Sequence, residues 1–358
     1  MITSGQRDGH EPPYRVAVIG AGTRSSNHIA AYEAIPEARV VAVADRSGTR
    51  SPAVAAAFGL RAYQDVAQML AQEKPYLVHV VTGPRGRVDL LEQIAQAGVP
   101  LCTLEKPVAL DVVELRRLLQ LLEWAPTRFA VSHQFRWHPD YEQVRHAVAS
   151  GALGELHWID MSAGMSLSGQ GTHILHYGME LNGGVAVRRV FGAVSGWDDA
   201  DPDHPGPVST EAQLEFSNGV RGVWVTGRAA PRVDSWPTNW QHVRVAAYGA
   251  SGRAVWEEFG RYEVESANCL LGGAFGGVDA WRRQNLSAQS KFHRAMLAWG
   301  HDPGQAPSTE LRRSLQEWKV VLALYASALT REEVVVSTWD PDVSLVEDLR
   351  AVLRRQAE

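Results

Sequence analysis

The chain has 358 residues, of which 45% are hydrophobic and 21% are charged, and its formal net charge is −5 at pH 7. This length and composition predict a soluble globular protein with two domains. The negative charge does not favour a nucleic-acid partner, which usually leaves a basic footprint, and no apolar run approaches the ~20 residues of a membrane helix.

The first 13 residues, Met1 to Pro13, are polar and lack the apolar core of a signal sequence, so we expect a flexible tail. The two cysteines, Cys102 and Cys269, stand in no metal-binding pattern. They predict reduced thiols in a cytoplasmic protein.

Patterns of strands and helices alternate through residues 14–133. Strands are predicted at Arg15–Gly20, Ala38–Asp45, Leu77–Val81, Pro100–Leu104 and Arg128–His133. Helices are predicted at Ser25–Ala34, Ser51–Phe58, Asp65–Gln72, Val88–Ala97 and, with Asp111 and Glu114 in capping-box spacing, up to Trp124. This alternation predicts an α/β domain with a doubly wound parallel sheet and right-handed crossovers.

A glycine-rich turn, Gly20-Ala21-Gly22, follows the first strand, and Asp45 ends the second. Strand, glycine turn, helix, strand and acid form the dinucleotide-binding fingerprint in its required context, with Ser25 in the third glycine position. Asp45 is expected to bind an adenosine ribose and to repel a 2′-phosphate, which favours NAD. Arg46 leaves NADP open, since an arginine there accommodates that phosphate.

Lys106 follows the apolar run Pro100–Leu104 directly after Glu105, at the sheet edge where such folds place their ligands. A lysine there is suited to act as a general acid or base once burial or a nearby cation lowers its pKa. The competing interpretation is an ordinary surface lysine at a strand end.

The pattern changes in residues 134–358, where a helix is predicted from Pro139 to Gly151. Polar and apolar residues alternate from Glu211 to Phe216, and Asn218-Gly219 is a strong hairpin signal before Val220–Thr226. A second hairpin is predicted to join Val243–Tyr248 to Arg253–Glu257. The last helices are predicted at Leu311–Leu329, with one apolar stripe, and after Ser344, with Glu347 in capping-box spacing.

His173 and His176 are three residues apart and can share a helical face. No carboxylate stands at ligand spacing beside them, so no metal site is predicted, and a proton-relay histidine is the sharper alternative to a structural role. The acidic loop from Asp198 to His204 is expected to be a solvated loop rather than a cation site.

Together these motifs resemble the glucose–fructose oxidoreductase, inositol dehydrogenase and rhizopine-catabolism (Gfo/Idh/MocA) family over about residues 14–336. Gly20–His28 is similar to the family's glycine-rich loop, and Val80–Pro84 is similar to its nicotinamide loop. Glu105-Lys106-Pro107 is similar to its most characteristic tripeptide. In the second half, His133–Pro139 is similar to the segment that enters the family's second domain, and Phe216–Val220 is similar to a strand and turn of that domain.

The resemblance implies a Rossmann domain followed by an α/β domain with a large, mostly antiparallel sheet that often forms an oligomer interface. It implies Lys106 and His173 as catalytic residues. The implied cofactor contacts are Gly20, Gly22, Thr23, Arg24, Ser25, Asp45, Arg46, Thr82, Gly83, Pro84, Glu105 and Lys106, and weaker substrate contacts are Gln134, Arg136 and His176.

The chain also departs from the family pattern. Where the family commonly has an Asp four residues before its catalytic His and another three residues after it, this chain has Gly169 and His176. The loop after Thr82 usually carries a His, and Arg87 stands near that place. The cofactor half is therefore expected to be intact, with an altered substrate half.

The leading hypothesis is an NAD(P)-dependent oxidoreductase that moves a hydride between the nicotinamide and a sugar, cyclitol or related polyol. The alternatives are a redox-neutral glycosidase that keeps its NAD bound and a non-catalytic sensor of the same fold. An apolar antiparallel face around Leu214, Phe216, Trp224 and Val225 predicts a homodimer or homotetramer.

Overall fold

The computed structural model describes residues 11–201, 204–232 and 238–356, so most of the predicted tail at residues 1–13 lies outside the described residues. The chain divides into two compact units. The first comprises the residues up to Glu105, Leu121–Ser132 and Gln289–Glu310, and the second comprises Lys106–Gln120, His133–Ala288 and Leu311–Glu358. Lys106 is therefore the first residue of the second unit, and two segments extend beyond the division expected near Gln134.

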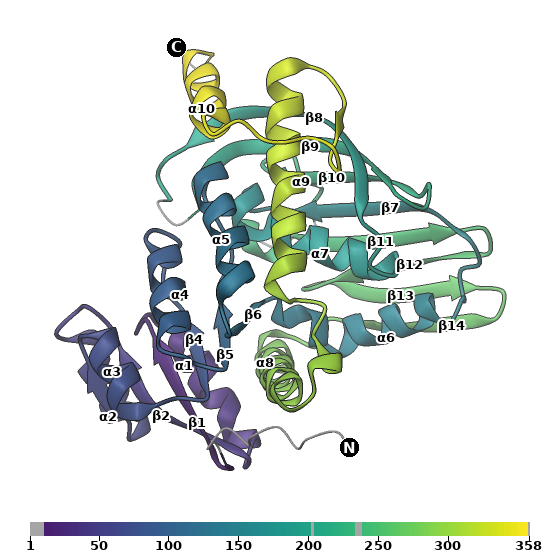
Figure 1. The fold of residues 1–358 in the computed structure, drawn as a ribbon. Coiled ribbons are helices and arrows are strands. Elements are labelled where there is room, and N and C mark those ends of the chain that lie inside the picture. Colours follow the sequence, from purple (N-terminus) through teal and green to yellow (C-terminus); the bar gives the residue numbers. More distant parts are fainter. Residues whose placement is uncertain (1–10, 202–203, 233–237, 357–358) are drawn as a thin grey trace, which may run out of the picture. The chain divides into compact units, whose positions relative to one another are not determined.

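The first unit is built on a parallel sheet of six strands in the order β3-β2-β1-β4-β5-β6. This confirms the predicted doubly wound parallel sheet. Its strands, labelled in Figure 1 except for β3, are β1 (Tyr14–Ile19), β2 (Ala38–Ala44), β3 (Arg61–Tyr63), β4 (Leu77–Val80), β5 (Leu101–Leu104) and β6 (Arg128–Val131). Strand β3 was not predicted, because three residues with exposed Arg61 and Ala62 carry no apolar pattern.

The helices that connect these strands are α1 (Thr23–Ala30), the short η1 (Ala31–Ala34), α2 (Arg50–Phe58), α3 (Val66–Glu73), α4 (Arg87–Gln96) and α5 (Val112–Trp124). Asp111 accepts a hydrogen bond from the Glu114 amide at 2.8 Å, and Glu114 accepts one from the Leu110 amide at 2.7 Å. This reciprocal pairing supports the capping signal that the sequence predicted for α5.

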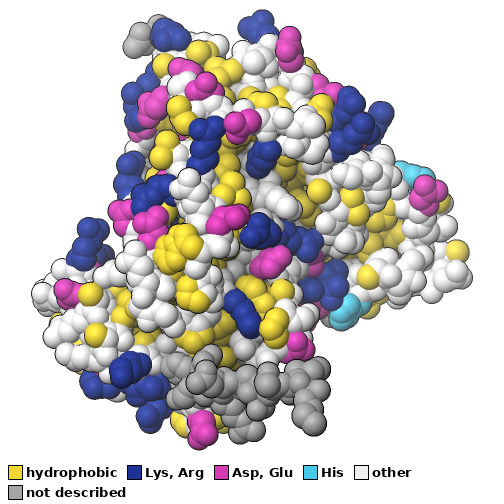
Figure 2. Space-filling view, viewed as in Figure 1, with side chains coloured by type: hydrophobic (Ala, Val, Ile, Leu, Met, Phe, Trp, Pro, Cys, Tyr) yellow, Lys and Arg dark blue, Asp and Glu magenta, His cyan; other side chains and the backbone are white. Residues whose placement is uncertain are grey.

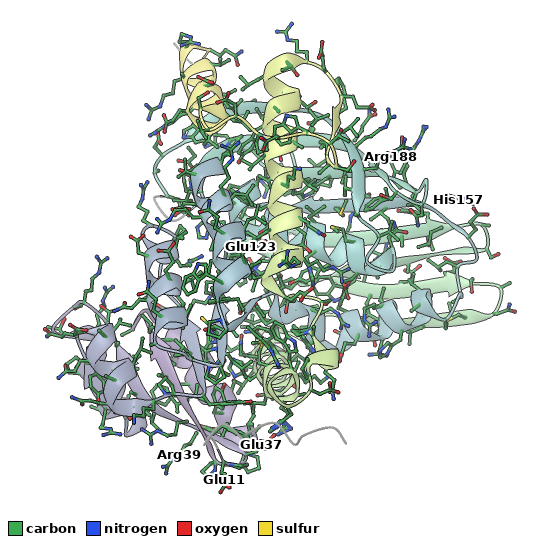
Figure 3. The ribbon with its side chains drawn as sticks, viewed as in Figure 1. Glu11, Glu37, Arg39, Glu123, His157 and Arg188 are labelled. Atoms are coloured by element: carbon green, nitrogen blue, oxygen red, sulfur yellow. The ribbon has the colours of Figure 1, made fainter. Side chains whose placement is uncertain are left out.

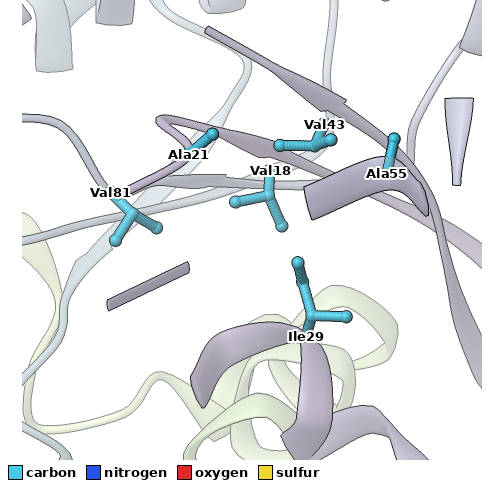
Figure 4. Close-up of a cluster of buried hydrophobic side chains, with 6 residues drawn as sticks. All are labelled: Val18, Ala21, Ile29, Val43, Ala55 and Val81. Atoms are coloured by element: carbon cyan, nitrogen blue, oxygen red, sulfur yellow. The ribbon is translucent and has the colours of Figure 1, made fainter. Parts of the chain in front are cut away.

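A small apolar core joins the glycine turn to the sheet. Its members, drawn in Figure 4, are Val18, Ala21, Ile29, Val43, Ala55 and Val81. Val18 and Val43 are completely buried, and each such side chain contributes about 1.5–3 kcal/mol to folding. The turn after β1 is thus held by packing as well as by its backbone.

The second unit contains a mixed sheet of nine strands in the order β14-β13-β12-β11-β7-β10-β9-β8-β15. Its neighbouring strands are antiparallel except for β10 and β7, which confirms the predicted mostly antiparallel sheet. The strands are β7 (Leu156–Ala163), β8 (Val187–Asp198), β9 (Gly206–Phe216), β10 (Arg221–Gly227), β11 (Val243–Gly249), β12 (Gly252–Glu257), β13 (Arg261–Ser266), β14 (Cys269–Ala274) and β15 (Val334–Val335). Gly219, with φ of +87°, makes the predicted turn between β9 and β10.

The helices of this unit are α6 (Pro139–Ala149), α7 (Thr172–Leu181), α9 (Leu311–Thr330) and α10 (Leu345–Arg355), with short turns η2 (Gln134–Trp137), η3 (Leu167–Gly171) and η4 (Asn239–Gln241). The short turn η5 (Pro303–Gln305) belongs to the first unit. The 24-residue helix α8 (Val278–His301) was not predicted, because charged and amide residues interrupt its apolar positions. The capping box expected at α10 does not form: the Ser344 hydroxyl bonds Asp348 at 2.6 Å instead of a backbone amide.

Of the four residues predicted to form an apolar face on the antiparallel sheet, only Val225 is partly exposed. Leu214, Phe216 and Trp224 are at most 3% exposed, because they pack inside the unit. The exposed aromatic side chains on this sheet include Trp158 on β7 and Phe191 on β8, at 40% and 46% exposure. Charged residues of both signs are interspersed with apolar ones on the surface, as Figure 2 shows for one face, and exposed polar residues such as His157 and Arg188 are labelled in Figure 3. Among the described residues, no helix is both long and apolar enough to cross a membrane.

Candidate active site

The turn between β1 and α1 contains two glycines with different roles. Gly20 has φ of +102°, and a Cβ there would lie 2.7 Å from the carbonyl oxygen of Val81. Gly22 has the ordinary angles φ −83° and ψ −177°, and a Cβ there would meet no other described atom within 4 Å. The fold itself requires Gly20, whereas Gly22 leaves open space beside the amide-rich start of α1, where an anionic group is favoured.

The next three predicted cofactor residues lie on the first turn of α1. Thr23 and Arg24 are exposed, while Ser25 is buried. The Ser25 hydroxyl donates a hydrogen bond of 2.6 Å to the carbonyl of Gly22. Ser25 therefore closes the turn from inside, which explains how a residue larger than glycine is accommodated at this position.

Asp45 ends β2 and is bonded to the glycine turn. Its two carboxylate oxygens accept hydrogen bonds from the Ala21 and Ser47 amides, each at 2.8 Å, and one also lies 3.0 Å from the Arg50 guanidinium. Burial alone would raise the pKa of Asp45, but these amides and Arg50 outweigh it, so the pKa is lowered from its ordinary value. Arg46 is exposed, and Arg50 is the arginine that pairs with this acid, a residue the sequence analysis did not single out.

Arg87 connects two predicted cofactor segments. Its guanidinium donates to the carbonyl of Thr82 at 2.6 Å and to the carbonyl of Glu105. Its own amide donates to the carbonyl of Pro84 at 3.1 Å, which closes the turn containing Gly83. Arg87 is 2% exposed, so it holds the loop after β4 against the end of β5 rather than facing solvent.

Glu105 contacts a buried cluster of histidines in the first unit. The Glu105 carboxylate lies 3.1 Å from His28 Nε2, and His28 Nδ1 lies 3.3 Å from His293 Nε2. His79 completes the cluster, with its ring nitrogens 2.8 Å from the Tyr32 hydroxyl and 2.5 Å from the Thr103 hydroxyl. Burial lowers the pKa of His79 and His293 well below the ordinary value, and the neighbouring histidines lower it further.

Lys106 contacts a residue of the acidic loop. Its Nζ lies 3.2 Å from Nε2 of His204, and His204 Nδ1 lies 2.9 Å from the Asp201 carboxylate. The loop is held on both sides of these residues. Asp199 pairs with Arg350 of α10 at 2.7 Å, and the Pro205 carbonyl accepts a hydrogen bond from Ser168 at 3.1 Å. The sequence analysis expected a solvated loop and did not single out His204 as a partner of the lysine.

His173 and His176 lie on α7 and are buried, at 3% and 0% exposure. His173 Nδ1 lies 2.6 Å from Nδ1 of His133, and His176 Nδ1 lies 2.8 Å from the carboxylate of Glu317 on α9. Spacing along the sequence indicated no carboxylate beside these histidines, but folding brings one from 141 residues further on.

The remaining predicted substrate residues are also enclosed. Gln134 is 1% exposed, and Arg136 pairs with Glu180 at 2.8 Å, where Arg313 joins it at 3.2 Å. Burial of Glu180 opposes its ionisation, but His176, Arg136 and Arg313 lower its pKa below the ordinary value. Arg136 thus balances the negative charge of the buried Glu180 carboxylate in this structure.

Two groups of side chains have donor atoms close enough for a metal ion, with all their ligand atoms within 4.8 Å of one another. They are His28, His79 and His293 in the first unit and His133, His176 and Glu317 in the second. The sequence pattern predicted neither grouping, since the members come from distant segments.

Comparison with known proteins bears directly on the cofactor half. Residues 14–133 match the family described as an oxidoreductase family with an NAD-binding Rossmann fold, Gfo/Idh/MocA. Residues 14–133 belong to this family. The Gfo/Idh/MocA match covers the glycine turn, Asp45, the Thr82 loop and Lys106.

Similar proteins agree with this assignment. D-apiose dehydrogenase of Paraburkholderia graminis is 34% identical over 211 residues, covering 52% of this chain and 56% of that protein. Inositol 2-dehydrogenase of Rhizobium meliloti is 29% identical over 149 residues, covering 42% of this chain and 44% of that protein. The chain thus spans about half the length of these curated relatives.

Solved structures show the same fold over most of the chain. An oxidoreductase from Agrobacterium radiobacter, in complex with NAD+, L-tartaric acid and magnesium, superposes with a TM-score of 0.77 at 21% identity, covering 91% of this chain and 99% of that one. An NAD-binding oxidoreductase from Klebsiella pneumoniae superposes with a TM-score of 0.74 at 16% identity and the same coverage. Both cover the second unit as well, so the two-sheet architecture is the fold of these structures.

The residues of the Gfo/Idh/MocA domain fit NAD. The open space at Gly22 lies beside the first amides of α1, which suits a pyrophosphate. Asp45 stays ionised beside this turn, where a carboxylate accepts hydrogen bonds from ribose hydroxyls. Sequence analysis assigned no site role to Arg50, His133, His204 or Glu317. It noted Arg87 only for its position near the expected His of the loop after Thr82.

Proposed function

We propose that the protein is an NAD(P)-dependent dehydrogenase that oxidises a secondary hydroxyl of a sugar, cyclitol or related polyol. The observation that carries the proposal is the position of Lys106. It directly follows Glu105, whose carboxylate and carbonyl are held by His28 and Arg87, and its ammonium nitrogen lies 3.2 Å from His204. A positioned lysine with a proton-accepting neighbour is suited to acid–base work on a hydroxyl.

Relatives support the class of substrate. Their names include D-apiose dehydrogenase, inositol 2-dehydrogenase and UDP-N-acetylglucosamine 3-dehydrogenase. All three names denote oxidation of a hydroxyl on a sugar or cyclitol. Our proposal extends this chemistry to the present chain without selecting one sugar.

The proposed reaction needs a hydride acceptor, a base for the hydroxyl proton and a group that orients the substrate. NAD bound at the glycine turn would supply the hydride acceptor. Lys106 in its neutral form would take the hydroxyl proton as the carbon–hydrogen bond breaks and the carbonyl forms. His204 would pass this proton onward, because its other nitrogen is held by Asp201, whose side chain is 44% exposed to water. His173 would orient the substrate or share the proton transfer.

NADP remains a possible cofactor because two arginines lie close to Asp45 in sequence. Arg50 pairs with the acid and is 60% exposed at its side chain, so it can turn toward a 2′-phosphate. Asp45 itself opposes that phosphate by charge. We therefore propose NAD as the preferred cofactor.

The test is a screen of sugars and polyols for NADH formation, followed by comparison of variants. Lys106→Met is expected to lower kcat by about 10²–10⁴-fold with NAD affinity unchanged, since a general acid–base group contributes that much and the pyrophosphate binds elsewhere. Lys319→Met, on the partly buried side of α9, is the matched control and is expected to keep full activity. Full activity in Lys106→Met would refute its role.

The same screen separates the alternative functions. Hydrolysis of a glycoside with no net NADH would indicate the redox-neutral glycosidase. Sugar binding with no turnover of any kind would indicate a sensor. Each outcome would replace the dehydrogenase proposal.

A further inference from the structure

The hydrogen bond between His133 and His173 couples the protonation of two imidazoles. It joins the Nδ1 atoms of both rings at 2.6 Å, and both side chains are at most 3% exposed. One Nδ1 must carry the hydrogen and the other must accept it. The tautomer of one ring therefore sets the tautomer of the other.

A carboxylate stands at the other side of His133. Glu317 Oε2 lies 3.8 Å from His133 Nε2, which is an ion-pair separation, and Oε2 makes no hydrogen bond among the described residues. Glu317 Oε1 accepts from His176 Nδ1 at 2.8 Å, and the His176 ring stacks on His133 with centroids 4.7 Å apart. Glu317 is 1% exposed, so its charge acts through little water.

These contacts select one arrangement of protons. A bare nitrogen facing a buried carboxylate is unfavourable, so His133 carries its hydrogen on Nε2. Its Nδ1 is then the acceptor, and His173 donates its own Nδ1 hydrogen to it. His173 is left with Nε2 as the basic nitrogen of its ring.

We propose that Glu317, acting through His133, holds His173 in the tautomer whose Nε2 is a base and stabilises the positive charge that forms when this base takes a proton. Glu317 and His133 are positioning residues, whereas His173 is the group that would meet the substrate. The inference rests on the proposed function for that last step.

The charge on the histidine pair would be shared along the relay. When His173 accepts a proton at Nε2, its Nδ1 hydrogen can shift to His133, which places the imidazolium beside Glu317. No bond other than those to hydrogen changes. The Glu317 carboxylate, 3.8 Å from His133 Nε2, would offset that charge, as an orienting acid does for a catalytic histidine.

Other titratable or charged groups surround the pair. The Tyr177 hydroxyl lies 3.4 Å from His173 Nδ1 on the same helix. The elements packed against or flanking α7 contribute Tyr141 and Arg145 of α6, Glu180 of α7 itself, Arg136 of η2, Arg313 of α9, and Asp160 and Arg244, which pair across β7 and β11. Glu180 forms ion pairs with Arg136 and Arg313, whereas Glu317 has a carboxylate oxygen 3.8 Å from His133 Nε2.

The test reads the tautomers directly, without a substrate. The full-length protein is labelled with ¹³C and ¹⁵N in histidine, and long-range proton–nitrogen spectra identify which ring nitrogen carries hydrogen, with assignment by His173→Gln and His133→Phe. The wild type is expected to show hydrogen on Nδ1 of His173 and on Nε2 of His133. Hydrogen on Nε2 of neutral His173 would overturn the proposal.

Variants then test the carboxylate. Glu317→Gln is expected to give a mixture of His173 tautomers and to move the protonation of His173 Nε2 to lower pH. Glu317→Asp, which retains a carboxylate, is expected to keep the wild-type tautomer as the major one. The matched control is Glu180→Gln, a buried acid on the same helix as His173 that is bonded to arginines, and it is expected to leave the His173 tautomer unchanged. An unchanged His173 spectrum in Glu317→Gln would refute the relay.

Activity and metal analysis complete the design. With a substrate in hand, Glu317→Gln should lower kcat roughly 10- to 100-fold at constant KM and move the acid limb of the pH–rate profile to lower pH. If no polyol is oxidised while the tautomers agree, the proposed function fails and the relay stands. Stoichiometric Zn²⁺ in the purified protein that is lost in Glu317→Gln would make Glu317 a metal ligand and overturn the relay.

Discussion

Gly22 offers the sharpest test of the cofactor site, because the fold does not need a glycine there. Its φ of −83° and ψ of −177° suit any residue, and an added Cβ would meet no other described atom within 4 Å. Gly22→Val should therefore fold like the wild type. The new side chain would occupy the space beside the first amides of α1 that a pyrophosphate requires.

The expected loss follows from the cost of overpacking. Forcing extra methyl groups into a filled space costs about 1–3 kcal/mol, which corresponds to about a 5- to 150-fold weaker Kd. The measurement is isothermal titration of NAD into both proteins, with the melting temperature recorded in parallel. We expect weaker binding in Gly22→Val at an unchanged Tm.

Gly20→Ala is the contrasting variant. Its Cβ would lie 2.7 Å from the Val81 carbonyl oxygen at φ of +102°, so the substitution should lower the Tm before any ligand is added. Unchanged NAD affinity in Gly22→Val would show that the cofactor does not pass over this turn. The assignment of the glycine turn as the pyrophosphate site would then be wrong.

Three further predictions concern specificity, pH and assembly. Asp45→Ala should bring the Kd values for NADP and NAD closer together, and a wild type that already prefers NADP would contradict this. Hydrogen bonds lower the pKa of Asp45 in the folded protein, so its contribution to the free energy of unfolding should be complete above about pH 4 and lost only in stronger acid. Burial lowers the pKa of His79 and His293, so the unfolded chain binds more protons below about pH 6.5, and the free energy of unfolding should fall there by up to about 1.4 kcal/mol per pH unit for each. His293→Phe should flatten that slope in urea titrations at several pH values, and an equal slope would refute the cause. We propose a homodimer or homotetramer that buries Trp158 and Phe191, so Phe191→Asp should reduce the mass measured by light scattering, whereas a monomeric wild type at micromolar concentration would exclude the assembly.

Local signals account for much of the cofactor half. Apolar runs and turn residues predicted five of its six strands, since each buried parallel strand is a short stretch that is apolar by itself. The glycine turn and Asp45 could be proposed as cofactor residues for the same reason: the motif is contained in one strand–turn–helix–strand segment. The short edge strand Arg61–Tyr63 was missed because only Tyr63 is buried.

The substrate half depends on residues that are far apart in the sequence. Lys106 and His204 are 98 positions apart, and His176 and Glu317 are 141 apart. No periodicity links such pairs, so the acidic loop was expected to be solvated. Glu317 lies in the predicted helix Leu311–Leu329, and nothing in that helix pointed to a histidine partner. Only the folded structure shows that His204 contacts Lys106.

The sequence by itself determined the class of fold and supplied the candidates for the cofactor turn and for acid–base chemistry, because these follow from patterns within a few tens of residues. Tertiary structure decided which of these groups have partners and of which kind. Arg136 forms an ion pair with Glu180, and Asp45 accepts a hydrogen bond from the Ala21 amide of the glycine turn. His173 is hydrogen-bonded to His133. The physical reason is that protonation and charge in a buried site are set by neighbours within a few ångströms, and these neighbours are supplied by packing between distant segments.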